Sequence, residues 1–146
     1  MYLDFVNIEG FPDSELLEQI LMLHEDIFKD SHSLVSKAKS KPKILFTIGL
    51  ERGEVVGYKI GYELNCLCFY SWLGGVNENH RNKGIASKLM YQQHLYLKGK
   101  GYKSVQTKTK NNWRNMLILN IRNGFDIIGT YTDTSDDLKI ILEKSL

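Results

Sequence analysis

Cysteine and proline are scarce in this 146-residue chain, which has two of each. Cys66 and Cys68 lie two residues apart in an apolar run, where a mutual disulfide would be strained and a tetrahedral metal site would lack two ligands. We therefore expect both thiols to be reduced and to lie half-buried on a strand. His24, His32 and His94 have no clustered partners in the sequence, so we expect no metal site.

Long hydrophobic runs and an excess of one charge are also missing. No stretch reaches the roughly 18 apolar residues that a membrane-spanning helix needs, and residues 1–30 lack the basic start and apolar core of a signal peptide. The 19 Lys and Arg residues are scattered among 17 Asp and Glu residues, which leaves a net charge of +2. Such a mild excess does not imply a nucleic-acid partner. We expect a cytoplasmic protein that binds neither membranes nor nucleic acids.

The composition, 42% hydrophobic and 25% charged, is typical of one folded domain, which we expect to span residues 1–146. Alternating or continuous apolar segments predict strands, and apolar residues at three- and four-residue spacing predict helices. The predicted order is strand 2–8, helix from 13 or 14, short helix or loop 31–43, strands 44–50, 54–64 and 66–76, helix from 84, strand 103–109, helix 112–123, and strands 125–132 and 138–144. This order predicts an α/β fold with a central mixed sheet flanked by helices.

The most informative segment is WLGGVNENHRNKGIASKL, residues 72–89, in which a strand ends in a polar turn and Gly84 opens a helix. The first-turn amides of a helix have no intrahelical acceptors, and the helix dipole adds positive charge there, so a phosphate can bind. Gly84 and Ala86 would let a pyrophosphate approach the backbone, and Ser87 could add a hydroxyl. The nearby basic residues are Arg81, Lys83 and Lys88.

This turn resembles the signature of the GNAT superfamily of acyl-CoA N-acyltransferases, which is Arg or Gln, two residues, Gly, one residue, then Gly or Ala. Residues 81–86, Arg-Asn-Lys-Gly-Ile-Ala, satisfy that pattern. A second GNAT-like feature, an amphipathic helix that runs into Gly-Phe, is matched by MLILNIRNGF at residues 116–125. The resemblance implies a mostly antiparallel sheet of about seven strands with about four helices, splayed between strands four and five.

The resemblance also implies an activity, the direct transfer of an acetyl group from acetyl-CoA to an amine through a tetrahedral intermediate. The pantetheine arm would pair with exposed backbone on the Val76 side of the splay, where Gly74 and Gly75 suit a bulge. A backbone N–H near Val76 would steady the oxyanion. The residues implied to bind the CoA thioester are Val76, Arg81, Asn82, Lys83, Gly84, Ile85, Ala86, Ser87 and Asn112.

The catalytic positions depart from the pattern of the family. Many members place a Tyr four residues before the helix-ending Gly, as the acid that reprotonates the leaving thiolate, and this chain has Asn120 there. Some members carry a catalytic Glu on the fourth strand, and the corresponding residue is Tyr70. We expect Tyr70 to assist proton transfer, with Tyr131, His80 and Glu63 as alternatives. A solvated site without a dedicated base is equally open.

Other functions remain open at this point. A catalytically silent acyl-CoA-binding module that regulates a partner is compatible with Asn120, because Asn can hydrogen-bond sulfur but cannot supply a proton. A small RNA-binding domain is disfavoured by the weak net charge and by the lack of a stacking motif. No motif identifies the acceptor, which can be a small-molecule amine or a peptide or protein amine. The alternating residues 140–144 fit either an internal strand or the edge of a homodimer.

Overall fold

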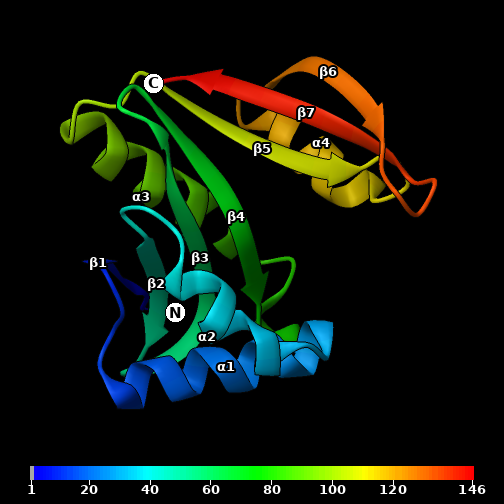
Figure 1. The fold of residues 1–146 in the computed structure, drawn as a ribbon. Coiled ribbons are helices and arrows are strands. Elements are labelled where there is room, and N and C mark those ends of the chain that lie inside the picture. Colours follow the sequence, from blue (N-terminus) through cyan, green and yellow to red (C-terminus); the bar gives the residue numbers. More distant parts are fainter. Residues whose placement is uncertain (1) are drawn as a thin grey trace.

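A computed structural model describes residues 2–146 as one seven-stranded sheet with helices packed against it (Figure 1). The elements are β1 (Asp4–Glu9), α1 (Ser14–Phe28), α2 (Ser31–Lys39), β2 (Leu45–Glu51), β3 (Glu54–Asn65), β4 (Cys68–Val76), a 3-10 turn (Glu78–His80), α3 (Ile85–Gly99), β5 (Ser104–Lys110), α4 (Arg114–Arg122), β6 (Asp126–Thr132) and β7 (Leu138–Ser145). The predicted element order and the mixed sheet are confirmed. No helix within the described residues is long and apolar enough to cross a bilayer.

The strands follow the order β1-β2-β3-β4-β5-β7-β6. Every neighbouring pair is antiparallel except β4 and β5, which run parallel because α3 carries the chain back between them. The strand β7 lies between β5 and β6, so it is internal. The alternative that residues 140–144 form the exposed edge of a dimer is therefore wrong.

The pairing of β4 with β5 is short. Residues 68–70 pair with residues 104–106, and beyond them the two strands diverge, as Figure 1 shows. The hydroxyl of Thr107 donates to the carbonyl of Ser71 at 3.0 Å, which marks the end of the junction. From residue 71 to residue 76 the side of β4 that faces β5 has no strand partner among residues 2–146. The predicted splay between the fourth and fifth strands is confirmed.

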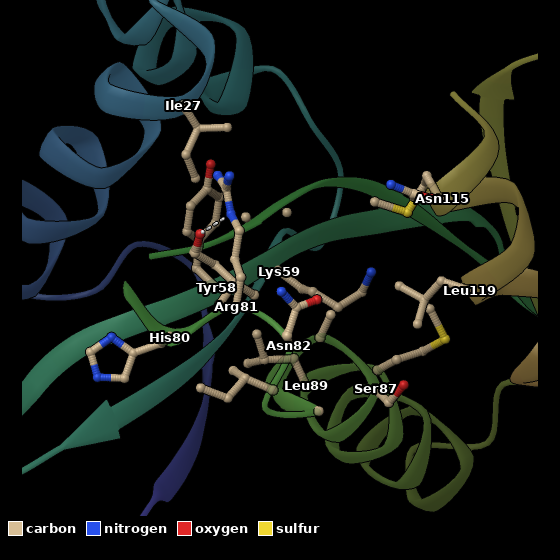
Figure 2. Close-up of a pocket in the computed structure, with 18 of the residues that line it drawn as sticks. Ile27, Tyr58, Lys59, His80, Arg81, Asn82, Ser87, Leu89, Asn115 and Leu119 are labelled. Carbon is tan, nitrogen blue, oxygen red and sulfur yellow. Dashed lines mark hydrogen bonds between the residues drawn. The ribbon is translucent and has the colours of Figure 1, made fainter. Parts of the chain in front are cut away.

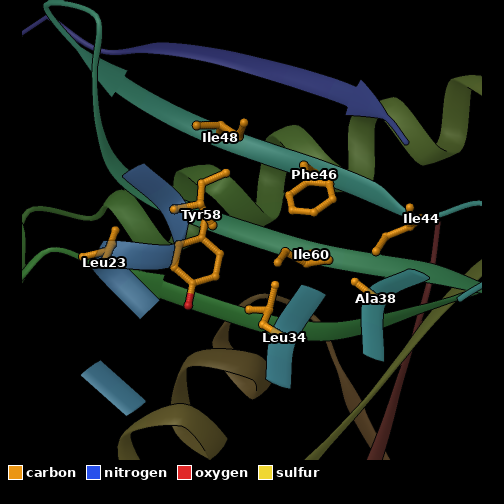
Figure 3. Close-up of a cluster of buried hydrophobic side chains, with 9 residues drawn as sticks. Leu23, Leu34, Ala38, Ile44, Phe46, Ile48, Tyr58 and Ile60 are labelled. Atoms are coloured by element: carbon orange, nitrogen blue, oxygen red, sulfur yellow. The ribbon is translucent and has the colours of Figure 1, made fainter. Parts of the chain in front are cut away.

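Three hydrophobic clusters fix the helices to the sheet, and the smallest packs Ile85 and Leu89 of α3 on Val56 of β3. On one face, α1 and α2 cover β2 and β3, and Figure 3 shows buried side chains of both layers in contact. Of the two predicted starting residues of α1, Asp13 is the N-cap, since its carboxylate accepts a hydrogen bond from the Leu16 amide at 2.9 Å. The second cluster contains residues of α3, α4, β5 and β7, among them Met90, Leu119 and Leu142. The helices α3 and α4 therefore flank the gap between β4 and β5.

The bulge in β4 lies at Trp72, which the register between β3 and β4 skips. Gly74 and Gly75, where we expected the bulge, pair regularly with Lys59 and Tyr58. That expectation was wrong, and these glycines meet a packing requirement instead. A Cβ on Gly74 would lie 3.2 Å from the Tyr58 carbonyl and 3.3 Å from Cγ of Lys59, so β3 leaves little room for a side chain.

Both cysteines are free thiols, as expected. Their exposure differs from the expectation, because neither is half-buried. Cys66 is exposed in the turn between β3 and β4, and Cys68 is buried at the start of β4. The strand begins two residues later than the apolar run predicts, since the Asn65 side chain accepts hydrogen bonds from the amides of Leu67 and Cys68 and closes the turn.

Candidate functional site

A cavity of about 460 Å³ lies where β4 leaves β5 (Figure 2). Its walls come from the end of α1, the middle of β3, the unpaired end of β4, the following turn, the first turns of α3, and α4. Gly74, Gly75 and Val76 line it, so the strand edge without a partner borders the cavity. An extended ligand with amide groups can add to such an edge as a further strand does.

Most of the predicted CoA-binding residues come together in this cavity. Those that line it are Val76, Arg81, Asn82, Gly84, Ile85, Ala86 and Ser87. Lys83 and Asn112 do not line it, and both side chains are exposed. From α4 the lining residues are Asn115, Met116 and Leu119, none of which was among the predicted CoA-binding residues.

The turn before α3 has the backbone geometry of an anion site. Asn82 and Gly84 have φ of 62° and 75°, in the left-handed region, and such residues turn neighbouring N–H groups toward a common point. Gly84 is the N-cap of α3, and no side chain of the described residues caps the helix, so its first amides are free to bind a ligand. Apart from Lys83 and Ile85, its neighbours in the chain, no described residue comes within 4 Å of a Cβ built on Gly84. The turn therefore fits the diphosphate that the sequence motif predicts.

Side chains of the turn are tied to the rest of the site. The Nε of Arg81 donates to the Val76 carbonyl at 3.3 Å, which folds the guanidinium over the cavity (Figure 2). The side chain of Asn123, just after α4, donates to the Ser87 hydroxyl at 3.3 Å. That contact joins the first turn of α3 to the end of α4 across the splay.

Of the alternative bases, His80 lines the cavity and Glu63 does not. The Nε2 of His80 is paired with the carboxylate of Glu51 at 3.0 Å, which ties the turn to the end of β2. Glu63 accepts a hydrogen bond from the Tyr102 hydroxyl at 2.9 Å. A structural role would therefore explain the contacts of both His80 and Glu63.

Tyr70, Tyr131 and Asn120, the predicted catalytic residues, do not line the cavity. The ammonium of Lys108 lies over the rings of Tyr70 and Tyr131, 5.9 Å and 5.3 Å from their centroids. Burial, followed by the neighbouring phenols of Tyr62 and Tyr131, raises the pKa of Tyr70 to about 12. The Tyr70 phenol is therefore protonated at neutral pH. Asn120 is buried in α4, directly after a residue that lines the cavity.

Lys59 is a cavity residue that sequence reasoning missed. Its half-buried side chain lies against Gly74, and Figure 2 shows it extended from β3 toward Leu119 of α4. Within residues 2–146 it makes no ion pair or side-chain hydrogen bond. Because burial penalises the charged form, the pKa of Lys59 falls to about 8. A signal was present, since Lys59 is the only charged residue between Glu54 and Glu63 in an apolar strand.

Tyr58, the preceding residue, borders the cavity from the face that α1 covers. Its hydroxyl is hydrogen-bonded to Nδ1 of His24, and Nε2 of His24 is bonded to the carboxylate of Asp30. Burial and then the charge of Asp30 raise the pKa of Tyr58 above its ordinary value. This chain of polar groups joins α1, the start of α2 and β3, and the sequence alone gave no sign of it.

No cluster of three or more His, Cys, Asp or Glu that could hold a metal ion occurs in the part of the chain that the structure describes. No aspartate or glutamate among these residues lines the cavity either. The charged groups around it are basic, and the apolar surface comes from residues such as Ile27, Phe28 and Leu89. The cavity suits an anionic ligand with an extended, partly apolar arm.

Comparison with known proteins agrees with the family resemblance seen in the sequence. The chain matches the sequence model of the acetyltransferase (GNAT) family over residues 9–116. No curated protein matches the chain.

Three solved structures illustrate the likeness of the fold. Ard1 from Thermoplasma volcanium is 16% identical, with a TM-score of 0.80 and 97% of each chain covered. An aminoglycoside 6'-N-acetyltransferase complexed with coenzyme A is 13% identical, with a TM-score of 0.79 and 96% of each chain covered. The ribosomal-protein-S18-alanine N-acetyltransferase from Escherichia coli is 12% identical, with a TM-score of 0.78, 96% of this chain and 94% of that chain covered.

Proposed function

Because this chain belongs to the GNAT family of acetyltransferases, we propose that it transfers an acetyl group from acetyl-CoA to an amine. One observation carries the proposal: an uncapped helix start and an unpaired strand edge border the same cavity. The first suits the diphosphate of CoA, and the second suits the amide-bearing pantetheine arm. A structural relative that was solved with coenzyme A supports this choice of ligand.

Binding of the donor follows from this arrangement. The amides from Arg81 to Ala86 would hold the diphosphate, with the Ser87 hydroxyl close by. The pantetheine would lie along β4 up to Gly74, opposite α4. Arg81 would leave the Val76 carbonyl and turn to a phosphate, since a charged partner binds guanidinium more strongly than a neutral carbonyl.

Transfer begins when a neutral amine attacks the thioester carbonyl. A backbone N–H near Val76 would stabilise the oxyanion, and the tetrahedral intermediate would then expel the thiolate. An alkylamine has a pKa of about 10, so its proton must leave directly or through water. The enzyme contributes mainly by orienting the two reactants in the cavity.

We retain Tyr70 as the candidate that assists proton transfer on the acceptor side. With its pKa at about 12, Tyr70 can donate a hydrogen bond or relay a proton, but it does not act as a free phenolate at neutral pH. The Tyr70→Phe variant is expected to lower kcat and alter the pH–rate profile. Unchanged activity across pH would remove Tyr70 from the mechanism and leave Tyr131 as the next residue to test.

The acceptor is proposed only as an amine. One structural relative is named for acetylating an aminoglycoside and another for acetylating an alanine of a ribosomal protein, so the fold serves both small and protein acceptors. A panel of amines and peptides with acetyl-CoA, followed by mass spectrometry of the products, would identify the class. We weigh a silent acyl-CoA-binding module beside the enzyme because Asn120 replaces the usual acid; binding without any release of CoA thiol would favour it.

Calorimetric titration with CoA tests the binding site itself. The Gly84→Glu variant places a carboxylate in the open space above the helix start and is expected to weaken CoA binding at least about 100-fold, since it repels phosphate and strains a backbone with φ of 75°. Gly53→Glu is the matched control, because Gly53 has φ of 80° and open space but lies in the β2–β3 turn. Equal affinity of the two variants, or no CoA binding by the unmodified protein, would refute the assignment.

A further inference from the structure

Lys59 presents an energetic problem in the protein without ligand. Its side chain is half-buried in the cavity, with no carboxylate among the described lining residues to neutralise its charge. A buried cation normally has an anionic partner or loses its proton. Titratable groups with a shifted pKa in a ligand cavity are often functional. A cation in such a place can stabilise or protonate an anion that forms during the reaction.

The position of Lys59 relates it to the leaving group. Lys59 pairs with Gly74 across β3 and β4, and its Cγ would lie 3.3 Å from a Cβ on Gly74, so the side chain lies against the face of β4 at a residue that has no side chain of its own. It then extends toward Leu119 of α4, the neighbour of Asn120 (Figure 2). The space between the unpaired edge of β4 and α4 is where the proposed function puts the end of the pantetheine arm. The ammonium therefore faces the region in which the thioester sulfur would lie.

We propose that Lys59 is the catalytic acid that protonates the departing CoA thiolate, a task for which Asn120 has no proton to give. This inference rests on the proposed function. The carbon–sulfur bond of the tetrahedral intermediate breaks, and its electron pair goes to sulfur. The sulfur takes a proton from the Lys59 ammonium, which leaves CoA as the thiol and Lys59 as a neutral amine. Solvent water returns a proton to Lys59 before the next turnover.

The acidity of Lys59 suits this transfer. Its pKa of about 8 lies close to that of an alkyl thiol, about 8.5, so the proton can pass to sulfur without a large barrier and can be regained near neutral pH. An unperturbed lysine would hold its proton more firmly. Burial in the cavity thus makes Lys59 a better acid.

The other titratable groups near Lys59, among the described residues, are less suited to give up a proton. The hydroxyl of Tyr58, the preceding residue, is bonded to His24, and burial raises the pKa of Tyr58. On α3, His94 interacts with the charge of Lys59, and burial, followed by the charges of Lys144 and Lys59, lowers the pKa of His94 to about 3. His94 is therefore neutral and has no proton to spare for sulfur. The turn contributes His80, paired with Glu51, and the guanidinium of Arg81.

The first experiment needs no acceptor. The thiol of CoA bound to the protein is titrated by its ultraviolet thiolate absorbance, for the unmodified protein, Lys59→Met, Lys59→Arg and the control Lys98→Met at the exposed far end of α3. A cation near sulfur lowers the thiol pKa, so the midpoint in Lys59→Met is expected about one to three pH units higher than in the other three proteins. Identical midpoints would show that the ammonium does not face sulfur and would overturn the proposal.

The second experiment measures the acid directly. With hydroxylamine, an amine that is already neutral at neutral pH, the kcat of the unmodified protein is expected to fall as the pH rises above about 8, where Lys59 loses its proton. Lys59→Met should lose about 100-fold in kcat and lose this alkaline fall. In Lys59→Arg the thiol of bound CoA should keep its low titration midpoint, because the cation remains. Its kcat should fall as in Lys59→Met, because arginine does not release its proton.

The outcomes separate this proposal from the one on which it rests. If the protein does not bind CoA, the proposed function fails. If CoA binds and turnover occurs but Lys59→Met keeps both the rate and the alkaline fall, only the role of Lys59 fails. Acetylation of Lys59 itself, seen by mass spectrometry after incubation with acetyl-CoA, would show a nucleophile in place of an acid and would equally overturn the proposal.

Discussion

Buried basic side chains are the unusual residues of this molecule. Lys59 lines the cavity without a counter-ion among the described residues, and His94 is buried with Nδ1 3.3 Å from the ammonium of Lys144. The other ring nitrogen of His94 is buried and has no hydrogen-bond partner among the described residues. Such groups reduce the stability of a fold, and their cost can be measured one residue at a time.

Lys59→Met is expected to stabilise the protein at neutral pH. The pKa of Lys59 is about 8 in the folded protein and 10.5 as a free side chain, so below pH 8 folding has to bury a charge that the unfolded chain keeps in water. The gain in the free energy of unfolding should be about 1–3 kcal/mol at pH 7. It should shrink as the pH rises from 8 to 10.5, because in this range folded Lys59 is already neutral and the unfolded chain loses its proton as well. Urea denaturation at pH 7 and pH 10 measures it. A destabilised variant at pH 7 would mean that the ammonium is well solvated.

His94 is expected to make the protein sensitive to acid. Its pKa is about 3 when folded and 6.5 as a free side chain, so between these values the unfolded chain binds a proton that the folded chain refuses. Stability should therefore fall as the pH drops from 6.5 toward 3, by about 2–3 kcal/mol at pH 4. His94→Leu should remove most of this slope in urea denaturation series. Parallel slopes for the two proteins would contradict the assignment.

At the scale of the elements, the strands β3 and β4 pack too closely for side chains at several positions. A Cβ on Gly61 would lie 2.6 Å from the Tyr70 carbonyl and 2.7 Å from the Phe69 ring. Backbone and a buried ring cannot move aside easily, so the strands would have to separate. Gly99, at the end of α3, has open space around its Cβ position and an ordinary φ.

Gly61→Ala is accordingly expected to destabilise the protein by about 2–3 kcal/mol, as an overpacked core residue does. Gly99→Ala is the control and should change stability by less than about 1 kcal/mol. Thermal and urea denaturation of both variants would show the difference. Similar stabilities would mean that β3 and β4 can shift at this position without cost.

Some features of the elements could be predicted from the sequence, and others could not. The order of strands and helices, the Asp13 cap and the Gly84 helix start were predictable, because periodicity and capping are local properties. The bulge at Trp72 was not, since it depends on how β3 and β4 align. The burial of Lys59 depends on helices far along the chain, and the one local signal, a single charge in an apolar strand, does not show what covers it. The catalytic assignments rest on family spacing, which this chain does not keep at Asn120.

At the scale of the whole molecule, the sheet consists of two parts that share one short junction. β1 to β4 form one part and β5 to β7 the other, and only residues 68–70 of β4 pair with β5. The rest of the boundary is the cavity and the helices α3 and α4. A ligand that lies along the free edge of β4 would therefore connect both parts.

CoA binding is expected to protect this boundary from exchange with solvent. Amide hydrogen exchange should slow by about 10-fold or more at residues 71–76 and 81–87, and the Tm should rise with CoA concentration as binding to the folded state requires. The exposed turn at residues 133–137 should exchange at an unchanged rate and serves as the internal control. Protection confined to α3, with none along β4, would mean that the arm of CoA does not pair with the strand.

The three-pair junction has a consequence for the survival of the protein in a cell. If CoA lies along the free edge of β4, the two parts of the sheet should stay closed more of the time when CoA is abundant, and a protease that cleaves the open form should then act more slowly. The lifetime of the polypeptide would then depend on the supply of its own ligand.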